Sequence, residues 1–179
     1  MSDTKEQLKT IARRVIQEKG VNGLSFRDLA AEAKIKSSSV HYYFPKKTDL
    51  IFEVAVDYTK AFHQEMVTIE QETRSPLKRL EKLLDLFKNN LPKRFCLCGM
   101  LAAESNQLDM KTKDVLTDSF KQTQNWIQER IKEFPGKKTA SQDKAGLLMA
   151  SLQGALLMDG IKGQEQYLSN VRKFIRTLG

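Results

Sequence analysis

Residues 26–45 read FRDLAAEAKIKSSSVHYYFP, and this stretch decides the fold of the chain. Two short segments with helical periodicity, 26–33 and 37–44, flank the turn KIK, and the closing proline cannot continue the second helix. Ala30 is small enough to let two helices cross closely, and Ile35 is placed to fill the angle between them. The stretch therefore predicts a helix-turn-helix unit.

The second segment of this unit has an outer face suited to a nucleic acid. Its outward positions carry short hydroxyls and hydrogen-bonding rings and no carboxylate, so such a helix can enter a major groove and reach base edges. Lysines bracket the segment at both ends, where backbone phosphates would lie. An ordinary helical hairpin with a polar outer face is the alternative, and the acid-free face argues against it. The outward residues are Ser37, Ser38, Ser39, His41 and Tyr42, and the lysines are Lys34, Lys36, Lys46 and Lys47.

The rest of the chain also reads with a helical period, and no segment alternates as a strand would. We therefore predict an all-α protein. Breaks are expected at Pro92-Lys93-Arg94 and at Pro135-Gly136-Lys137-Lys138. The remaining helices are expected at about 8–19, 47–70, 76–91, 95–108, 111–134, 139–159 and 163–178.

Charge and composition favour a polyanionic partner. The chain has 179 residues, with 30 Lys+Arg against 22 Asp+Glu and a net charge of +8. Residues 1–50 carry ten basic and six acidic side chains, so about a quarter of the chain holds half of the excess charge. No apolar run is long enough to span a bilayer, and the polar start lacks a signal peptide. We expect a cytoplasmic protein without a membrane partner.

Enzymatic chemistry has little support in the sequence. Two cysteines and two histidines make a disulfide framework or a zinc site improbable, so no metal or cofactor is expected. No glycine-rich phosphate loop or serine-histidine-acid arrangement is present. A thiol hydrolase would have to pair Cys96 or Cys98 with His63. A helical adaptor that binds only proteins is a second alternative, but it has no reason to carry a basic, acid-free helix.

Residues 11–50 resemble the DNA-binding domain of the TetR family of bacterial transcriptional regulators. The resemblance implies an N-terminal helix-turn-helix domain, residues 1–46, and a C-terminal helical domain for effector binding and dimerisation, residues 47–179. It further implies a homodimer on a palindromic double-stranded DNA operator, usually a repressor, which a small molecule releases. The motifs that carry the resemblance are Ile11-Ala12, Gly20, Ser25-Phe26-Arg27-Asp28-Leu29-Ala30, Ser39-Val40-His41-Tyr42-Tyr43-Phe44 and Lys47-Thr48-Asp49-Leu50.

The resemblance also assigns DNA contacts by position. Three positions depart from the usual pattern: Lys34 replaces a common turn glycine, Ser38 a frequent glycine and His41 a frequent tyrosine. A left-handed Lys34 would cost about 1 kcal/mol. The departures leave DNA binding intact and bear on which bases are read. The expected DNA-binding residues are Ser25, Arg27, Lys36, Ser37, Ser38, Ser39, His41, Tyr42, Tyr43 and Lys47.

Residues 145–158 contain no charged side chain, so a helix there must be buried on more than one face. One face can join the core of the chain, and a second copy is an economical partner for the other. The central helix of a monomer is the alternative. The expected core face is Ala145, Leu148, Met149, Leu152 and Leu156, and the expected dimer face is Leu147, Ala150, Gly154, Leu157 and Ile161.

The resemblance places an effector pocket among the long C-terminal helices, although aromatic and methionine side chains at helical spacing are commonly just core. Cys96-Leu97-Cys98 follows two basic residues at an expected helix start, which would favour a thiolate. This segment is similar to one in family members that sense electrophiles through a cysteine. Two inert packing thiols are the other interpretation. The candidate pocket residues are Phe62, Met66, Phe87, Phe95, Cys96, Met100, Trp126 and Met149, with Cys96 and Cys98 as candidate sensors.

Overall fold

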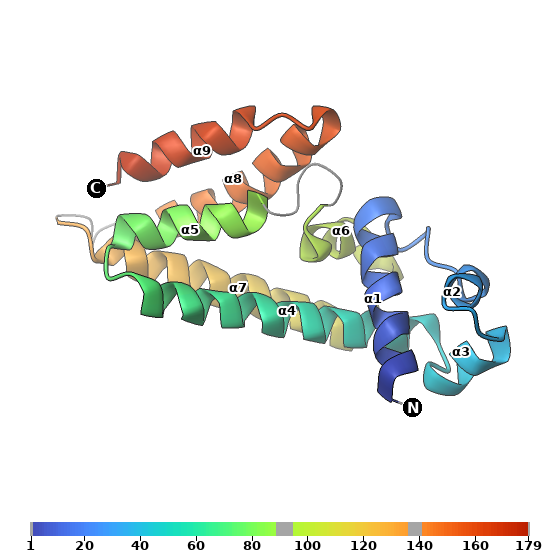
Figure 1. Ribbon diagram of the computed structural model, residues 1–179. Coiled ribbons are helices and arrows are strands. Elements are labelled where there is room, and N and C mark those ends of the chain that lie inside the picture. Colours follow the sequence, from blue (N-terminus) through green and yellow to red (C-terminus); the bar gives the residue numbers. More distant parts are fainter. Residues whose placement is uncertain (1, 89–94, 136–140, 179) are drawn as a thin grey trace. The chain divides into compact units, whose positions relative to one another are not determined.

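The computed structural model describes residues 2–88, 95–135 and 141–178 (Figure 1). Within these residues every regular element is a helix, which confirms the predicted all-α class. The elements are α1 (Ser2–Lys19), α2 (Phe26–Glu32), α3 (Ser37–Tyr43), α4 (Lys47–Glu72), α5 (Pro76–Lys88), α6 (Leu97–Ala103), the 3-10 turn η1 (Ser105–Gln107), α7 (Met110–Lys132), α8 (Ser141–Lys162) and α9 (Gln166–Arg176).

The chain divides into two compact units that do not follow a single cut in the sequence. The first contains residues 1–60 and 97–117, and the second contains residues 61–96 and 118–179. The compact units do not divide at residue 47, because α6 packs against α1 and Lys111 of α7 pairs with Asp49 of α4. The functional boundary expected there from the motif stays a prediction.

The first unit has a small apolar core beneath the helix-turn-helix. Two lysines of α1 pair with acids of α4: Lys5 Nζ lies 2.7 Å from Glu53 and Lys9 Nζ lies 2.6 Å from Asp57. Helices α2 and α3 lie side by side, as Figure 1 shows. These contacts fix α2 and α3 on a rigid base. The fully buried side chains of this apolar core include Leu8, Ala12, Ile16, Leu29, Val40, Phe44, Leu50, Ile51, Leu97 and Leu101.

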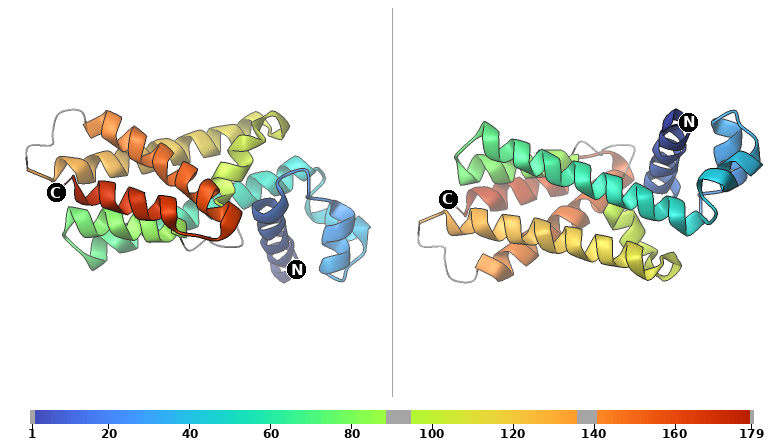
Figure 2. Two further views of the ribbon diagram at one scale, coloured as in Figure 1. Left: turned by 90° about the horizontal axis from the view of Figure 1, so that it is seen from above. Right: turned by 90° about the horizontal axis from the view of Figure 1, so that it is seen from below.

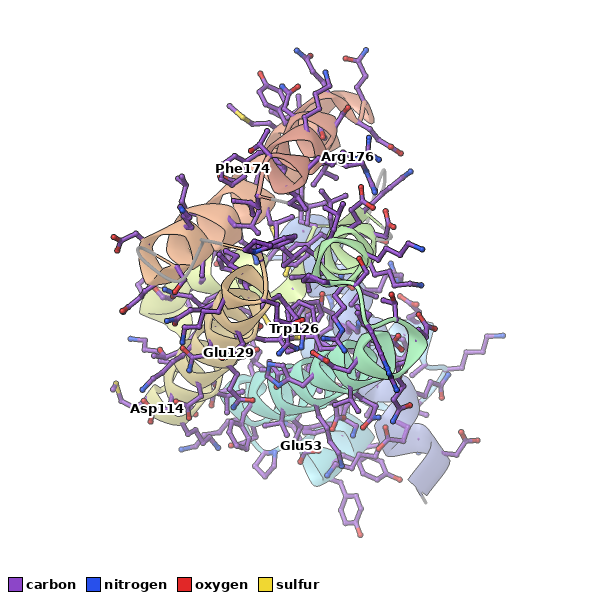
Figure 3. All side chains as sticks on the ribbon, turned by 90° about the vertical axis from the view of Figure 1, so that its left-hand side faces the viewer. Glu53, Asp114, Trp126, Glu129, Phe174 and Arg176 are labelled. Atoms are coloured by element: carbon purple, nitrogen blue, oxygen red, sulfur yellow. The ribbon has the colours of Figure 1, made fainter. Side chains whose placement is uncertain are left out.

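The second unit packs α5 against α8 and α9, with α8 and α9 adjacent in both views of Figure 2. Figure 3 labels Trp126 beside α7, the helix that carries it. At one end, Arg79 and Arg130 share the carboxylates of Glu70 and Glu133, with Arg130 Nε 2.6 Å from Glu133 and Arg79 3.1 Å from Glu70. Each cation thus faces two anions, which offsets the cost of their partial burial.

Several helix ends differ from the sequence expectations. Helix α6 begins at Leu97 and ends at Ala103, so Cys96 precedes the helix instead of opening it. Helix α8 extends to Lys162, where Gly163 adopts a φ of +65° and permits the turn. The predicted breaks at residues 92–94 and 136–138 lie outside the described residues. In the described part of the chain, no helix has the length and apolarity to cross a membrane.

Candidate nucleic-acid interface

The turn of the helix-turn-helix is built as the sequence predicts, at a conformational cost. Ser25 Oγ accepts the N–H of Asp28 at 3.5 Å and caps α2. Lys34 has a φ of +56°, the left-handed conformation expected from its place as a glycine substitute. The N–H of Ile35 then donates to the carbonyl of Ala30 at 3.0 Å, which closes the end of α2 and starts the turn.

The predicted DNA-contacting residues lie on or beside one exposed helix. Arg27 and Tyr42 extend furthest, with 90% of the Arg27 side chain and 70% of Tyr42 exposed. The face formed by α3 carries no carboxylate. Glu32, the nearest acid in sequence, pairs with Arg14, and Asp28 lies beside Arg27. Lys36, Ser37, Ser38 and His41 are also exposed, whereas Ser25, Ser39, Tyr43 and Lys47 are half-buried.

Aromatic contacts hold the exposed rings in place. His41 meets the edge of Phe26 from α2, with ring centroids 4.9 Å apart, and Tyr42 meets Tyr43 at 5.2 Å. Such edge-to-face pairs reduce the rotamer freedom of the exposed rings. These contacts set the directions of the His41 and Tyr42 rings on the face.

Lys47 has an intramolecular partner that the sequence did not reveal. Its Nζ donates to the carbonyl of Val21 at 2.6 Å, in the turn between α1 and α2. Burial lowers the pKa of Lys47, and the Glu104 carboxylate acts in the opposite direction. The lysine therefore sits at the edge of the face and not at its exposed surface.

Glu104, at the end of α6, completes this contact and was not among the predicted site residues. Its carboxylate accepts the backbone N–H of Val21 and, at 3.3 Å, the side-chain amide of Asn22. Because 83 residues separate Val21 and Glu104 in the chain, no local sequence pattern could have identified the pair.

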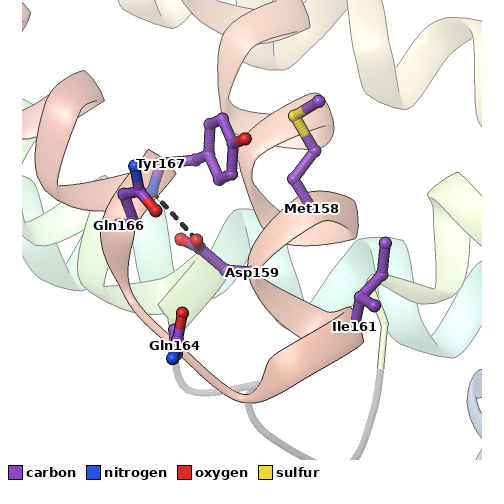
Figure 4. Close-up of a pocket in the computed structure, with 6 residues that line it drawn as sticks. All are labelled: Met158, Asp159, Ile161, Gln164, Gln166 and Tyr167. Atoms are coloured by element: carbon purple, nitrogen blue, oxygen red, sulfur yellow. Dashed lines mark hydrogen bonds between the residues drawn. The ribbon is translucent and has the colours of Figure 1, made fainter.

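The predicted division of α8 into two faces agrees with its side-chain burial. Ala145, Leu148 and Leu152 are completely buried. The residues of the predicted dimer face are largely uncovered: Leu147 is 59% exposed, Leu157 49% and Ile161 79%. Ala150 is also exposed, and no described atom lies within 4 Å of the position that a Cβ would take at Gly154. This face continues into a pocket of about 240 Å³ between α8 and α9, lined by Met158, Asp159, Ile161, Gln164, Gln166 and Tyr167 (Figure 4).

The predicted effector residues divide between the two units. Phe62 and Phe87 of the second unit meet edge-to-face at 5.7 Å, and Met66 is buried in the same unit. Arg130 lies over the Trp126 ring at 5.2 Å, while the buried indole N–H finds no acceptor among the described residues. Met149 and Phe95 are half-buried in this unit, whereas Met100, also half-buried, belongs to the first unit.

The two cysteines are buried thiols. Cys96 is 7% exposed and Cys98 is 5% exposed. The side-chain amide of Gln153, from α8, donates to Cys96 Sγ at 3.6 Å. Lys93 and Arg94, the cations expected beside Cys96, lie outside the described residues. No group of three or more metal-ligating side chains occurs in the part of the chain that the structure describes.

An exposed α3 presented by a capped α2 and a rigid base defines a helix-turn-helix DNA-binding regulator. Residues 10–54 match the model of the bacterial regulatory proteins of the tetR family, and residues 76–174 match the LmrA/YxaF-like transcriptional regulator C-terminal domain. The chain belongs to the TetR family of transcriptional regulators.

Individual relatives align with this chain along nearly its whole length. An uncharacterised HTH-type regulator of Lactococcus lactis is 26% identical over 164 residues, covering 88% of this chain and 84% of that protein. The HTH-type regulator LmrA of Bacillus subtilis is 18% identical over 166 residues, covering 87% and 86%. A TetR regulator from Legionella pneumophila matches with a TM-score of 0.90 and 28% identity, covering 99% of this chain and 97% of that one.

Proposed function

We propose that this protein is a cytoplasmic repressor that binds a palindromic operator as a homodimer and leaves it when an effector binds the second unit. The observation that carries the proposal is the exposed, acid-free face of α3, with Tyr42 70% exposed and lysines at its edges. In a dimer, two such helices would read half-sites about one turn of DNA apart.

The uncovered face of α8 supports the dimer. Leu147, Leu157 and Ile161 are large apolar side chains left largely exposed in one chain, and such a surface favours association. The open space over Gly154 would allow α8 of a second copy to approach closely. A two-fold axis through this face would make it self-complementary, as a homodimer requires.

Trp126 supports a small-molecule effector. Its buried N–H lacks an acceptor among the described residues, and a buried donor without an acceptor is costly. An apolar or aromatic effector with one acceptor oxygen opposite the indole would remove this cost. A reactive effector that modifies Cys96, whose Sγ accepts a hydrogen bond from the Gln153 amide, is the second candidate.

The test begins with genomic DNA fragments that the purified wild-type protein enriches, followed by affinity measurements on the recovered site. Tyr42→Ala and Ser39→Ala should alter the preference between sequences, whereas Lys47→Ala should weaken binding to all of them and reduce the salt slope by about one unit. Lys60→Ala, which removes an exposed lysine of α4 outside the face, is the matched control.

Circular dichroism checks that each variant folds. If no sequence is enriched over random DNA and heparin retains the protein no better than a neutral protein of equal size, the proposal is wrong. The helical adaptor then becomes the better interpretation.

A further inference from the structure

The turn between α1 and α2 is held on both sides of a single residue. The N–H of Val21 donates to the Glu104 carboxylate, and its carbonyl accepts Lys47 Nζ at 2.6 Å. Val21 is only 1% exposed, and both contacts are partly buried. Through its two backbone groups, Val21 thus links the end of α6 to the start of α4. It lies five residues before the start of α2.

The local backbone is shaped around the Glu104 carboxylate. Gly20 has a φ of +74°, and a Cβ built there would lie 2.7 Å from Glu104 Oε1. Any other residue at position 20 would therefore be strained, and its Cβ would displace the carboxylate. After the N–H of Val21, the side-chain amide of Asn22 is a second donor to the carboxylate, at 3.3 Å. The carboxylate thus accepts hydrogen bonds from Val21 and Asn22, and the absence of a Cβ at Gly20 leaves room for it.

We propose that Glu104 is a positioning residue for DNA binding, which holds the α1–α2 turn through Val21 and thereby places Lys47 at the edge of the α3 face. Glu104 touches no DNA in this arrangement. It fixes the peptide whose carbonyl orients the lysine, so the phosphate contact of Lys47 is organised before DNA arrives. The inference rests on the proposed DNA contact of Lys47.

Two variants separate the hydrogen bond from the charge. Glu104→Gln and Glu104→Ala remove the same negative charge, but only glutamine keeps an oxygen that can accept the N–H of Val21. The two variants have equal charge, but Glu104→Ala should bind the recovered DNA site roughly tenfold more weakly than Glu104→Gln. The reason is that alanine cannot accept the hydrogen bond from the buried N–H of Val21. Glu65→Ala, which removes an exposed carboxylate from the second unit, controls for net charge.

A double-mutant cycle tests the route through Lys47. If Glu104 acts by placing the lysine, Glu104→Ala should cost little further affinity in a Lys47→Ala background, and the two single variants should lose a similar part of the salt slope. If Glu104 only stabilised the fold, Glu104→Ala would lower the melting temperature and leave the DNA affinity and salt slope of the folded protein unchanged. If Glu104→Ala fails to fold, Glu104→Asp, which keeps the charge but is one methylene shorter, takes its place.

The outcomes separate this inference from the proposed function. Equal affinities for Glu104→Ala and Glu104→Gln, or additive effects in the cycle, would overturn the positioning role while wild-type DNA binding stands. Absence of DNA binding by the wild type would instead reject the proposed function itself.

Discussion

The carboxylate of Asp159, in α8, accepts the backbone N–H of Leu168, in α9, at 2.8 Å, and its other oxygen accepts that of Tyr167 at 2.9 Å (Figure 4). Helix α9 has no local side-chain cap, since Glu165 makes none. Asp159 is 1% exposed and acts as a cap supplied by another helix.

Removing this cap should destabilise the second unit. Asp159→Ala leaves two backbone donors without an acceptor in a buried site, and we expect a loss of about 2–4 kcal/mol in the free energy of unfolding. Chemical denaturation followed by circular dichroism measures it. Asp114→Ala, which removes an exposed acid of α7, should change stability by less than about 0.5 kcal/mol. Equal effects of the two substitutions would contradict the capping role.

Lys34→Gly should stabilise the first unit by about 1 kcal/mol, because glycine adopts the observed φ of +56° without the steric cost that lysine has. Lys36→Gly serves as the control, since Lys36 has a φ of −74° and gains nothing from glycine. Thermal unfolding of the two variants measures the difference. A melting temperature of Lys34→Gly at or below that of the wild type would show that the turn is not strained.

Stability should fall in mild acid because of His63. Burial lowers the pKa of this histidine below its ordinary value of 6.5, and Ser119, 3.4 Å away, only partly opposes the shift. The unfolded chain therefore binds a proton more readily than the folded chain. The resulting stability is fully present above pH 6.5 and is lost as the pH falls from there through the lowered pKa. His63→Gln should flatten this part of a stability profile, and an unchanged profile would contradict the assignment.

Gly154→Arg should convert a dimer into a folded monomer. A Cβ at this position would have no described atom within 4 Å, so the variant should fold, yet two copies of the arginine would bring like charges together across an apolar interface. Light scattering gives the oligomeric state, and loss of the dimer should also weaken DNA binding. Asn125→Arg on the exposed side of α7 is the control. A wild-type protein that is monomeric at micromolar concentration would rule out this interface.

Cys96 should react with a small electrophile before Cys98 does, because Cys96 stands just before the first residue of α6, whereas Cys98 lies inside the helix. The burial of Cys96 should make the reaction slow. Alkylation of Cys96 should loosen DNA binding roughly 5- to 150-fold, a coupling of 1–3 kcal/mol. Mass spectrometry and operator binding of wild type, Cys96→Ser and Cys98→Ser measure both effects. If Cys96→Ser loses affinity on treatment as readily as the wild type, the cysteines only pack.

The sequence by itself determined the elements that depend on local chemistry. The left-handed Lys34, the Ser25 cap and the two faces of α8 all follow from residue types at fixed spacing, since helical period and φ preferences act over a few residues. The same locality made residues 26–45 sufficient to predict the helix-turn-helix. The tertiary structure alone decided contacts between distant segments. Glu104 meets Val21 and Asp159 caps α9 because packing brings their helices together, and no periodic pattern encodes which polar side chain will face a given backbone N–H.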